Sequence, residues 1–281
     1  MKKKLLLRFR FLFFLLLLVS SSRAQIYFGI SGGYGFPLAK QVIAVDYTLG
    51  SSGTYAFGGL QGSFGKGYTS GFFVGYNFND HWSGEVSFER LSSSKIKSLV
   101  IDTVIPNEKH TIERMARAKL SNIIPSVRYT IGEGKFKTYI RTGLLIGFNG
   151  KITSEATMTN EYYYGSDSSE ITEIFRGGVS LGFLGGVGVN YSLNNRIVFF
   201  AEAVMHAQTW SPLKSSITKY TGNGVDHLNS MSTSFTEREY KEKSTSNFPG
   251  QSPDSPSILL KRSYPFSSYG LTLGIVFKFN N

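Results

Sequence analysis

The stretch Tyr269-Gly-Leu-Thr-Leu-Gly-Ile-Val-Phe-Lys-Phe279, close to the end of the chain, decides the fold. Apolar side chains occupy every second position, without a break, from Tyr269 to Phe279. The positions between them hold mainly glycine, threonine and lysine. A strand has this pattern when one face meets hydrocarbon and the other faces a narrow, partly polar interior. We therefore interpret this segment as a membrane-spanning β-strand.

The same alternation recurs along the chain, which predicts eight strands in all. They cover residues 26–36, 68–78, 82–91, 119–131, 136–148, 178–191, 197–207 and 267–279. The second face of these strands is largely Gly, Ser, Asn and Thr, which suits the tight lumen of an eight-stranded barrel better than a solvated surface. The prediction is an all-β fold, a transmembrane antiparallel up-and-down β-barrel of eight strands. A soluble eight-stranded barrel or sandwich is the alternative.

The connections between these strands alternate strictly between short and long. The short ones are 79–81, 132–135 and 192–196, and the long ones are 37–67, 92–118, 149–177 and 208–266. Outer-membrane barrels place short turns in the periplasm and long loops outside the cell. Aromatic residues gather near the short turns, where an interfacial girdle is expected. These are Tyr76, Phe78, Trp82, Tyr129, Phe136, Tyr191, Phe277 and Phe279.

Residues 1–24 have the pattern of a secretory signal peptide. Basic residues precede the apolar run 11–19, and Ser22-Arg23-Ala24 places small residues before a cut at Gln25. An N-terminal membrane anchor is the alternative, but the run is shorter than the roughly 18 apolar residues that a spanning helix needs. The expected organisation is a signal peptide over 1–24 and a barrel over 25–281, exported to the outer membrane.

The charge and cysteine content narrow the function classes. The formal charge of +11 falls to +5 without the signal, because six basic residues leave with it and 24 basic face 19 acidic residues. The remaining basic residues are dispersed, so no nucleic-acid partner is expected. The chain has no cysteine, which excludes disulfides and a lipoprotein anchor. No cofactor is expected.

Four segments carry a resemblance to a known family: Gly75-Tyr-Asn-Phe-Asn-Asp-His-Trp-Ser-Gly-Glu85, the run 186–195, Phe200-Ala-Glu202 and the closing strand. With them the chain resembles the small eight-stranded outer-membrane barrels of the OmpA/OmpX-like group, in particular the barrel-only proteins common in Bacteroidetes. The resemblance covers essentially all of 25–281. It implies the barrel architecture and is nearly silent on activity, because one barrel fold hosts many functions.

The strand alternation assigns six ionisable residues to the interior: Glu85, Glu89, Arg128, Arg141, Glu202 and His206. Counted from the nearest turns, Glu85, Arg128, Arg141 and Glu202 reach a similar depth. Two carboxylates and two guanidinium groups in one layer predict an ion-pair network, since an unpaired buried charge is costly. The network is either structural or a gate on an ion path. The narrow lumen favours the structural interpretation.

An enzyme is the alternative class. Small barrels that modify lipids carry a His and a Ser arranged for acyl transfer, but the position that follows His206 on its own face is Gln208. The four histidines show no metal-ligand spacing. No catalytic or metal site is therefore predicted. We expect a non-enzymatic scaffold or binding protein with these partners: outer-membrane lipid, the barrel-assembly machinery through the C-terminal strand, and an envelope or extracellular protein through the loops 149–177 and 208–266. A lipid-modifying enzyme and a narrow gated pore stay open.

Overall fold

The computed structural model describes residues 25–38, 41–49, 55–105, 108–242 and 252–279. The predicted signal peptide and the terminal Asn280 and Asn281 lie outside the described residues.

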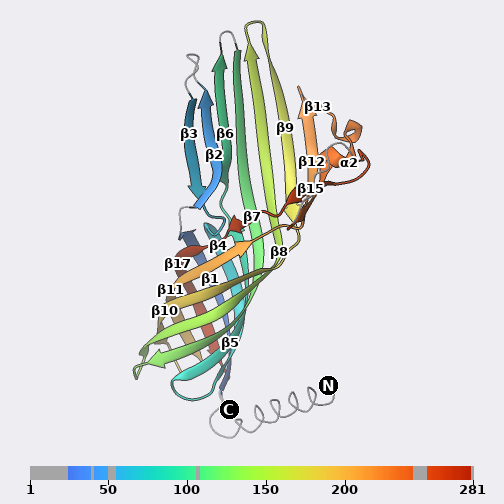
Figure 1. The fold of residues 1–281 in the computed structure, drawn as a ribbon. Coiled ribbons are helices and arrows are strands. Elements are labelled where there is room, and N and C mark those ends of the chain that lie inside the picture. The colour runs from blue at the N-terminus through green and yellow to red at the C-terminus, as the bar shows by residue number, and fades with distance from the viewer. Residues whose placement is uncertain (1–24, 39–40, 50–54, 106–107, 243–251, 280–281) are drawn as a thin grey trace, which may run out of the picture.

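Eight strands form a closed antiparallel ring (Figure 1). In ring order they are β1 (Gln25–Pro37), β4 (Gly67–Asn77), β5 (Trp82–Ser93), β7 (Glu108–Ile131), β8 (Phe136–Tyr162), β10 (Ser180–Ser192), β11 (Ile197–Trp210) and β17 (Ser268–Lys278). The ring closes where β17 pairs with β1, from Tyr27 opposite Lys278 to Pro37 opposite Ser268. Closure satisfies the backbone groups of both edges, which a β-structure needs in order to cross a lipid bilayer. The predicted fold class is confirmed.

The outer surface of the ring is apolar on all sides. Alternate residues on the strands leave half or more of their surface exposed; they include Phe72, Val86, Ile140, Leu144, Phe183, Val187, Leu271 and Leu273. In water, leaving one such side chain exposed forgoes about 1.5–3 kcal/mol compared with burying it. A continuous apolar belt of this kind marks a surface that meets lipid.

Two of the three short connections are stabilised by their own asparagine side chains. Asn79 Oδ1 accepts hydrogen bonds from the backbone N–H groups of His81 and Trp82 at 2.9 and 2.8 Å. Asn194 Oδ1 does the same for Arg196 and Ile197 at 2.8 Å each. Such local side-chain bonds fix a turn of few residues. All three short turns lie at one end of the barrel.

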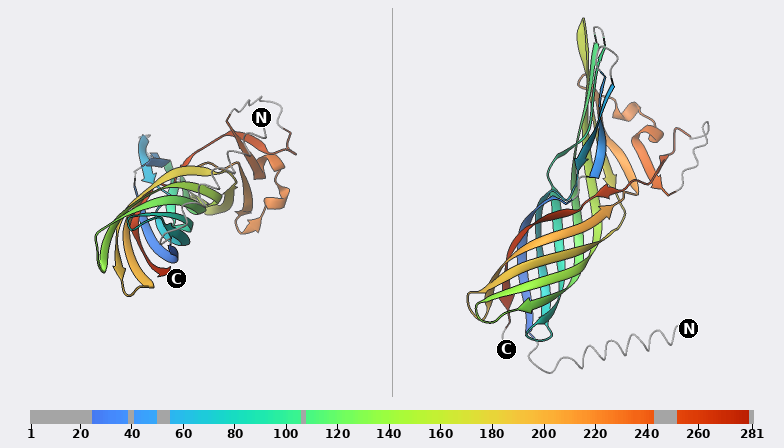
Figure 2. Two further views of the ribbon diagram at one scale, coloured as in Figure 1. Left: turned by 90° about the horizontal axis from the view of Figure 1, so that it is seen from below. Right: turned by 60° about the vertical axis from the view of Figure 1, so that its left-hand side comes forward.

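The long connections are built mostly of strands, and they form a tall sheet that rises from the other end of the barrel (Figure 2). Strand β7 starts at Glu108 and β8 ends at Tyr162, well beyond the predicted limits of 119 and 148. They are joined there by β2 (Gln41–Leu49), β3 (Tyr55–Gly62), β6 (Ile96–Ile105), β9 (Gly165–Arg176) and β12 (Lys214–Gly222). We call this sheet, with 108–119 of β7 and 151–162 of β8, the blade.

A β-bulge marks the point where the barrel becomes the blade. Between β7 and β8 the pairing of Ser121 with Phe148 is followed by Lys119 with Lys151, so β8 carries one residue more. Asn149 takes the left-handed conformation with φ 51°. A bulge bends its strand, and here it also reverses the alternation of β8, so that Lys151 faces outward and Ile152 faces inward.

The longest connection, after β11, folds into small elements beside the blade. They are β13 (Val225–Asp226), η1 (Leu228–Ser230), α2 (Thr233–Thr236), β14 (Glu237–Lys241), β15 (Ser257–Leu260) and β16 (Tyr264–Pro265). Ser215 Oγ donates to the buried Glu173 Oε1 at 2.7 Å, and Arg238 forms an ion pair with the same carboxylate. These contacts tie β9, β12 and β14 together.

None of the described helices has the length and apolar composition of a membrane span.

Candidate functional site in the barrel lumen

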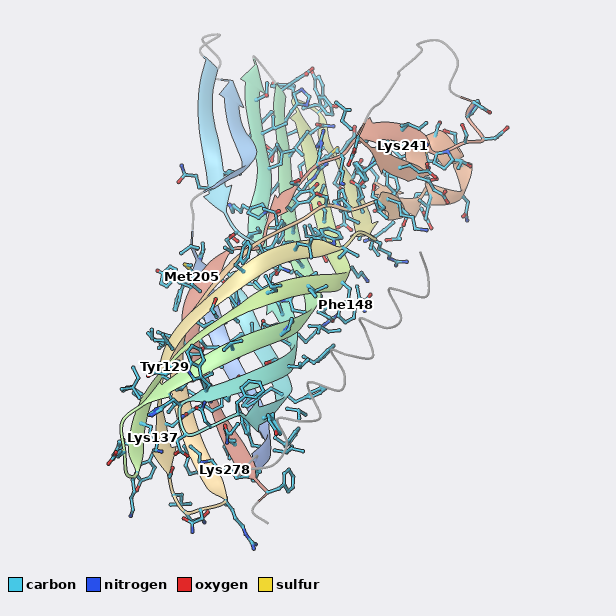
Figure 3. The ribbon with its side chains drawn as sticks, turned by 60° about the horizontal axis from the view of Figure 1, so that its bottom comes forward. Tyr129, Lys137, Phe148, Met205, Lys241 and Lys278 are labelled. Atoms are coloured by element: carbon cyan, nitrogen blue, oxygen red, sulfur yellow. The ribbon has the colours of Figure 1, made fainter. Side chains whose placement is uncertain are left out.

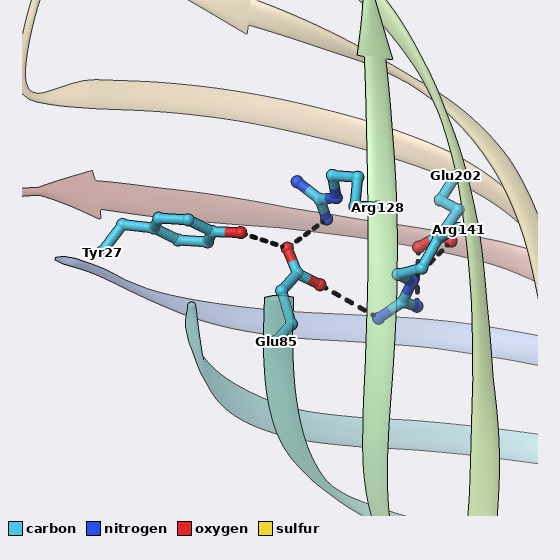
Figure 4. A network of polar contacts seen from close by, with 5 residues as sticks. All are labelled: Tyr27, Glu85, Arg128, Arg141 and Glu202. Atoms are coloured by element: carbon cyan, nitrogen blue, oxygen red, sulfur yellow. Dashed lines mark hydrogen bonds and ion pairs between the residues drawn. The ribbon is translucent and has the colours of Figure 1, made fainter. Parts of the chain in front are cut away.

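Two carboxylates and two guanidinium groups meet in the lumen (Figure 4). Arg141 of β8 holds Glu202 of β11 in a bidentate pair, with Nε donating to Oε1 at 2.9 Å and Nη2 to Oε2 at 2.8 Å. Its Nη1 also lies 3.6 Å from Oε2 of Glu85 on β5. The second guanidinium, Arg128 of β7, lies with Nη2 3.0 Å from Oε1 of Glu85. The three neighbouring strands β5, β7 and β8 are thereby connected with β11 through two positive and two negative charges.

Two tyrosines complete this network. Tyr27 of β1 donates its hydroxyl hydrogen to Glu85 Oε1 at 2.8 Å. The Arg128 guanidinium lies over the ring of Tyr139, 4.1 Å from its centroid, which is a cation–π contact. The carboxylates of Glu85 and Glu202 are fully buried. Removing one partner of such a cluster would leave a buried charge uncompensated.

Interior glycines provide the room for these large side chains. A Cβ at Gly186 would lie 2.1 Å from Glu202 Oε1, and a Cβ at Gly188 would lie 2.4 Å from the ring of Tyr139. Gly75 makes the same space for Tyr27. The glycine-rich inner face of the strands is thus the complement of the charges and rings that fill the lumen.

Glu89 and His206, the other two residues assigned to the interior, do not join this network. Glu89 Oε1 and His206 Nε2 are both buried without a hydrogen-bond partner among the described residues. Within the ring, His206 lies opposite Ser268 of β17, and only 7% of its surface is exposed. Neither residue is in contact with the four-charge cluster.

Apolar layers fill the lumen beyond the charged layer. Ile124, Leu145, Leu184 and Val204 form a buried cluster on the blade side of the network. Farther out a larger cluster closes the mouth of the barrel. It consists of Phe64, Leu91, Ala116, Ala118, Leu120, Ile152, Phe175, Trp210, Tyr240 and Phe266. We call this cluster the cap.

Trp210 lies at the centre of the cap with none of its surface exposed. Its indole ring covers Gly150, where a Cβ would lie 2.3 Å from Nε1. Phe64 comes from a connection near β3, Phe266 from the segment before β17 and Tyr240 from β14. The sequence analysis did not predict the cap. Leu91 and Leu120 lie in predicted strands, but the other eight members lie in the long connections, for which no pairing was predicted. The large aromatics in these connections were the available signal.

A polar cavity of about 460 Å³ lies at the opposite end of the barrel, among the short turns. Arg128 and Tyr27 lie at its inner end, and Lys137 and Lys278 line it near the mouth. Figure 3 shows these two lysines at the end of the barrel away from the blade. The charged network therefore closes this cavity from the rest of the lumen.

The blade ends in exposed aromatics at the turn between β8 and β9. Tyr163 is 74% exposed and Tyr164 95% exposed, and their ring centroids lie 4.7 Å apart. The preceding hairpin is held by cross-strand pairing that runs from Lys151 opposite Arg176 to Tyr162 opposite Gly165. The aromatics are thus carried on an ordered strand pair.

The described residues contain no group of three or more His, Cys, Asp or Glu side chains that could hold a metal ion.

A closed antiparallel ring with an apolar outer belt, short turns at one end and long strand extensions at the other defines an integral outer-membrane β-barrel protein. No protein-family model matches the sequence, and no curated protein matches it either.

Among solved structures, the chain is similar to three small outer-membrane proteins. Neisserial surface protein A matches at 13% identity over 92% of this chain and 100% of its own, with a TM-score of 0.32. OprG from Pseudomonas aeruginosa matches at 12% over 92% and 96%, with a TM-score of 0.41. Ail, the attachment invasion locus protein of Yersinia pestis, matches at 11% over 91% and 97%, with a TM-score of 0.29. Because these sequence identities and TM-scores are low, the assignment to the outer-membrane β-barrel proteins rests on the closed strand ring and its apolar belt.

Proposed function

We propose that this protein is a non-enzymatic scaffold of the outer membrane whose blade binds a protein partner at its tip. The observation that carries the proposal is the exposed pair Tyr163 and Tyr164, whose rings meet edge to face at the end of an ordered hairpin. Tyrosine is enriched in protein interfaces because its ring gives a large contact area at small entropic cost. A barrel that only had to close its ring of strands would need much shorter connections between them.

The same proposal includes the route to the membrane. Residues 1–24 direct export and are removed before Gln25, and the closing strand β17 presents the C-terminal signal to the barrel-assembly machinery. The alternating apolar face of β17 supports this role. The barrel-only OmpA/OmpX-like group of Bacteroidetes remains the expected family on sequence grounds.

The geometry favours the scaffold over a lipid-modifying enzyme. His206 faces the lumen, beneath the cap, and its neighbour on the adjacent strand β17 is Ser268. An acyl chain in the bilayer would contact the outer surface of the barrel, where His206 is not accessible. A catalytic base must come within hydrogen-bond reach of its substrate.

The geometry also favours a structural network over a gate. Two apolar clusters lie between the charged layer and the blade side of the barrel. An ion that passed the network would have to cross both clusters, and apolar surroundings strongly disfavour an unpaired charge.

A photo-crosslinking experiment tests the binding proposal. The photoreactive residue p-benzoylphenylalanine replaces Tyr164 in the full-length protein in intact cells, and a matched protein carries it at Thr157, an exposed position on the blade below the tip. We expect a discrete protein adduct from position 164 that weakens when Tyr163→Ser is added. Absence of an adduct at 164, or the same adduct from 157, would contradict binding at the tip.

A further inference from the structure

Four basic residues lie side by side on the outward face of the blade, at its base. Lys119 of β7 is directly opposite Lys151 of β8, Lys151 is opposite Arg176 of β9, and Arg176 is opposite Lys214 of β12. We call these four residues the basic row. Adjacent strands lie about 4.8 Å apart, so the row spans about 14 Å.

Like charges directly opposite each other destabilise a sheet. In the basic row, no nearby carboxylate offsets this repulsion through an ion pair. Within the described residues, none of the four has an ion-pair partner. Glu239 of β14 lies opposite Lys214, but its carboxylate forms an ion pair with Lys241 at 3.3 Å. The basic row therefore presents unneutralised positive charge to the outside.

Most other described lysines in and beside the blade have a carboxylate partner, unlike those of the basic row. Lys95 pairs with Glu155 and Lys97 pairs with Glu113, both at 3.0 Å. Lys219 and Lys241 also have carboxylate partners, Glu170 and Glu239 respectively. Lys109, near the far end of β7, also has no ion pair among the described residues, but it stands alone and lies opposite Glu161. In the basic row, by contrast, four unpaired cations lie on neighbouring strands.

The basic row lies immediately beyond the apolar belt. On β8 the bulge separates Lys151 from Phe148, whose ring centroid is 6.3 Å from that of Phe88, which stacks at 5.4 Å on Phe72. Figure 3 shows Phe148 where the barrel meets the blade. On the next hairpin, Arg176 is separated only by two glycines from the exposed Val179. Aromatic rings followed by charge are the arrangement expected at the level of lipid head groups.

We propose that the basic row binds phosphate groups on the head groups of the membrane lipids that surround the blade side of the barrel. Lysine and arginine donate charge-assisted hydrogen bonds to phosphate, and arginine can do so with two parallel bonds. A row of about 14 Å can contact more than one phosphate at once, so the matching ligand is a lipid whose head group carries two phosphates. This role is independent of partner binding at Tyr163 and Tyr164.

Lipid binding to the detergent-solubilised full-length protein tests the proposal, with native mass spectrometry as the readout. The probes are diphosphorylated lipid A and the same lipid after complete dephosphorylation. The row variant combines Lys119→Gln, Lys151→Gln, Arg176→Gln and Lys214→Gln. A matched control with the same loss of charge combines Lys95→Gln, Lys97→Gln, Lys219→Gln and Lys241→Gln.

We expect the row variant to raise the dissociation constant for the diphosphorylated lipid at least about ten-fold, since each cationic side chain near an anionic lipid surface contributes separately. The control should stay close to wild type, and the dephosphorylated lipid should bind all three proteins weakly. Unchanged affinity of the row variant, or an equal loss in the control, would overturn the proposal. So would displacement of the lipid by excess inorganic phosphate, which would indicate a site for the free ion. If the row variant does not fold, Lys119→Gln with Lys151→Gln carries the same test.

Discussion

At the scale of single residues, the stability of the barrel depends on the buried charges of the four-charge network. Arg141 neutralises Glu202 through two hydrogen bonds and also faces Glu85. Arg141→Ala leaves the buried Glu202 unpaired, so we expect the free energy of unfolding to fall by roughly 3–5 kcal/mol. The measurement is urea unfolding in lipid vesicles, followed by the electrophoretic mobility of folded and unfolded forms.

The double variant Arg141→Ala with Glu202→Ala is the control for this prediction. It removes both charges of the pair, so its loss of stability should be smaller than the sum of the two single losses. Simple additivity would show that the pair is not coupled. If either single variant instead opens a stable conductance in planar bilayers, the network acts as a gate.

Gly150 is the residue on which packing of the cap depends. A Cβ there would lie 2.3 Å from Nε1 and 2.4 Å from Cε2 of Trp210. Gly150→Ala should therefore displace the indole ring and lower stability by about 1–3 kcal/mol, as overpacking does in other cores. In a Trp82→Phe background, the emission of Trp210 should shift to longer wavelength. Gly165→Ala, where nothing lies within 4 Å of the added carbon, should change neither quantity.

At the scale of elements, we expect the distal pairing of β7 with β8 to depend on pH. The hydrogen bond between His110 Nδ1 and Asn160 Oδ1, at 2.8 Å, raises the pKa of His110, and the carboxylate of Glu108 raises this pKa further. A raised pKa in the folded state stabilises the strand end below the ordinary value of about 6.5. That contribution is lost as the pH rises through the folded-state pKa.

We therefore expect the amides near 108–112 and 158–162 to be better protected from hydrogen exchange at pH 5.5 than at pH 8, after correction for the intrinsic rate. His110→Gln keeps a polar side chain but cannot titrate, and it should remove this difference. Greater protection at pH 8 in the wild-type protein would show that the assigned contacts do not control the strand end.

At the scale of the whole molecule, we expect the barrel to fold without β12 and the elements beside the blade. Replacing 212–262 with a short Gly-Ser bridge removes β12 to β15 and takes Tyr240 from the cap. It leaves all eight strands of the ring intact. We expect the shortened protein to keep the different electrophoretic mobilities before and after boiling that a folded barrel shows. Identical mobilities would show that the ring needs this segment.

The same shortened protein should remain closed to ions. The cluster around Leu145 and the charged layer fill the lumen behind the cap. Planar-bilayer recordings should therefore show no stable conductance, either in the wild-type protein or after the deletion. A steady conductance in the deleted protein alone would assign the closure to the cap and not to the layers beneath it.

The barrel could be predicted from the sequence because its signal is local. Alternation such as that from Tyr269 to Phe279 distinguishes the two faces of one strand. The lengths of the connections indicate at which end of the barrel each connection lies. The depth count also placed Glu85, Arg128, Arg141 and Glu202 at one level, and the structure brings these four together. The same count left Glu89 and His206 outside this level, but it did not show that Glu89 Oε1 and His206 Nε2 lack hydrogen-bond partners among the described residues. Parity gives the face of a strand and not the contacts that a side chain makes.

The blade, the cap and the basic row were decided only by the tertiary structure. The strands of the blade are paired between long connections whose partners the strand alternation does not specify, and a bulge at Asn149 resets which side Lys151 faces. The cap gathers Phe64, Trp210 and Phe266 from distant segments. The four residues of the basic row are far apart in the sequence but adjacent in the sheet. Local periodicity carries no information about strand register between segments far apart in the chain, and register is what brings these residues together.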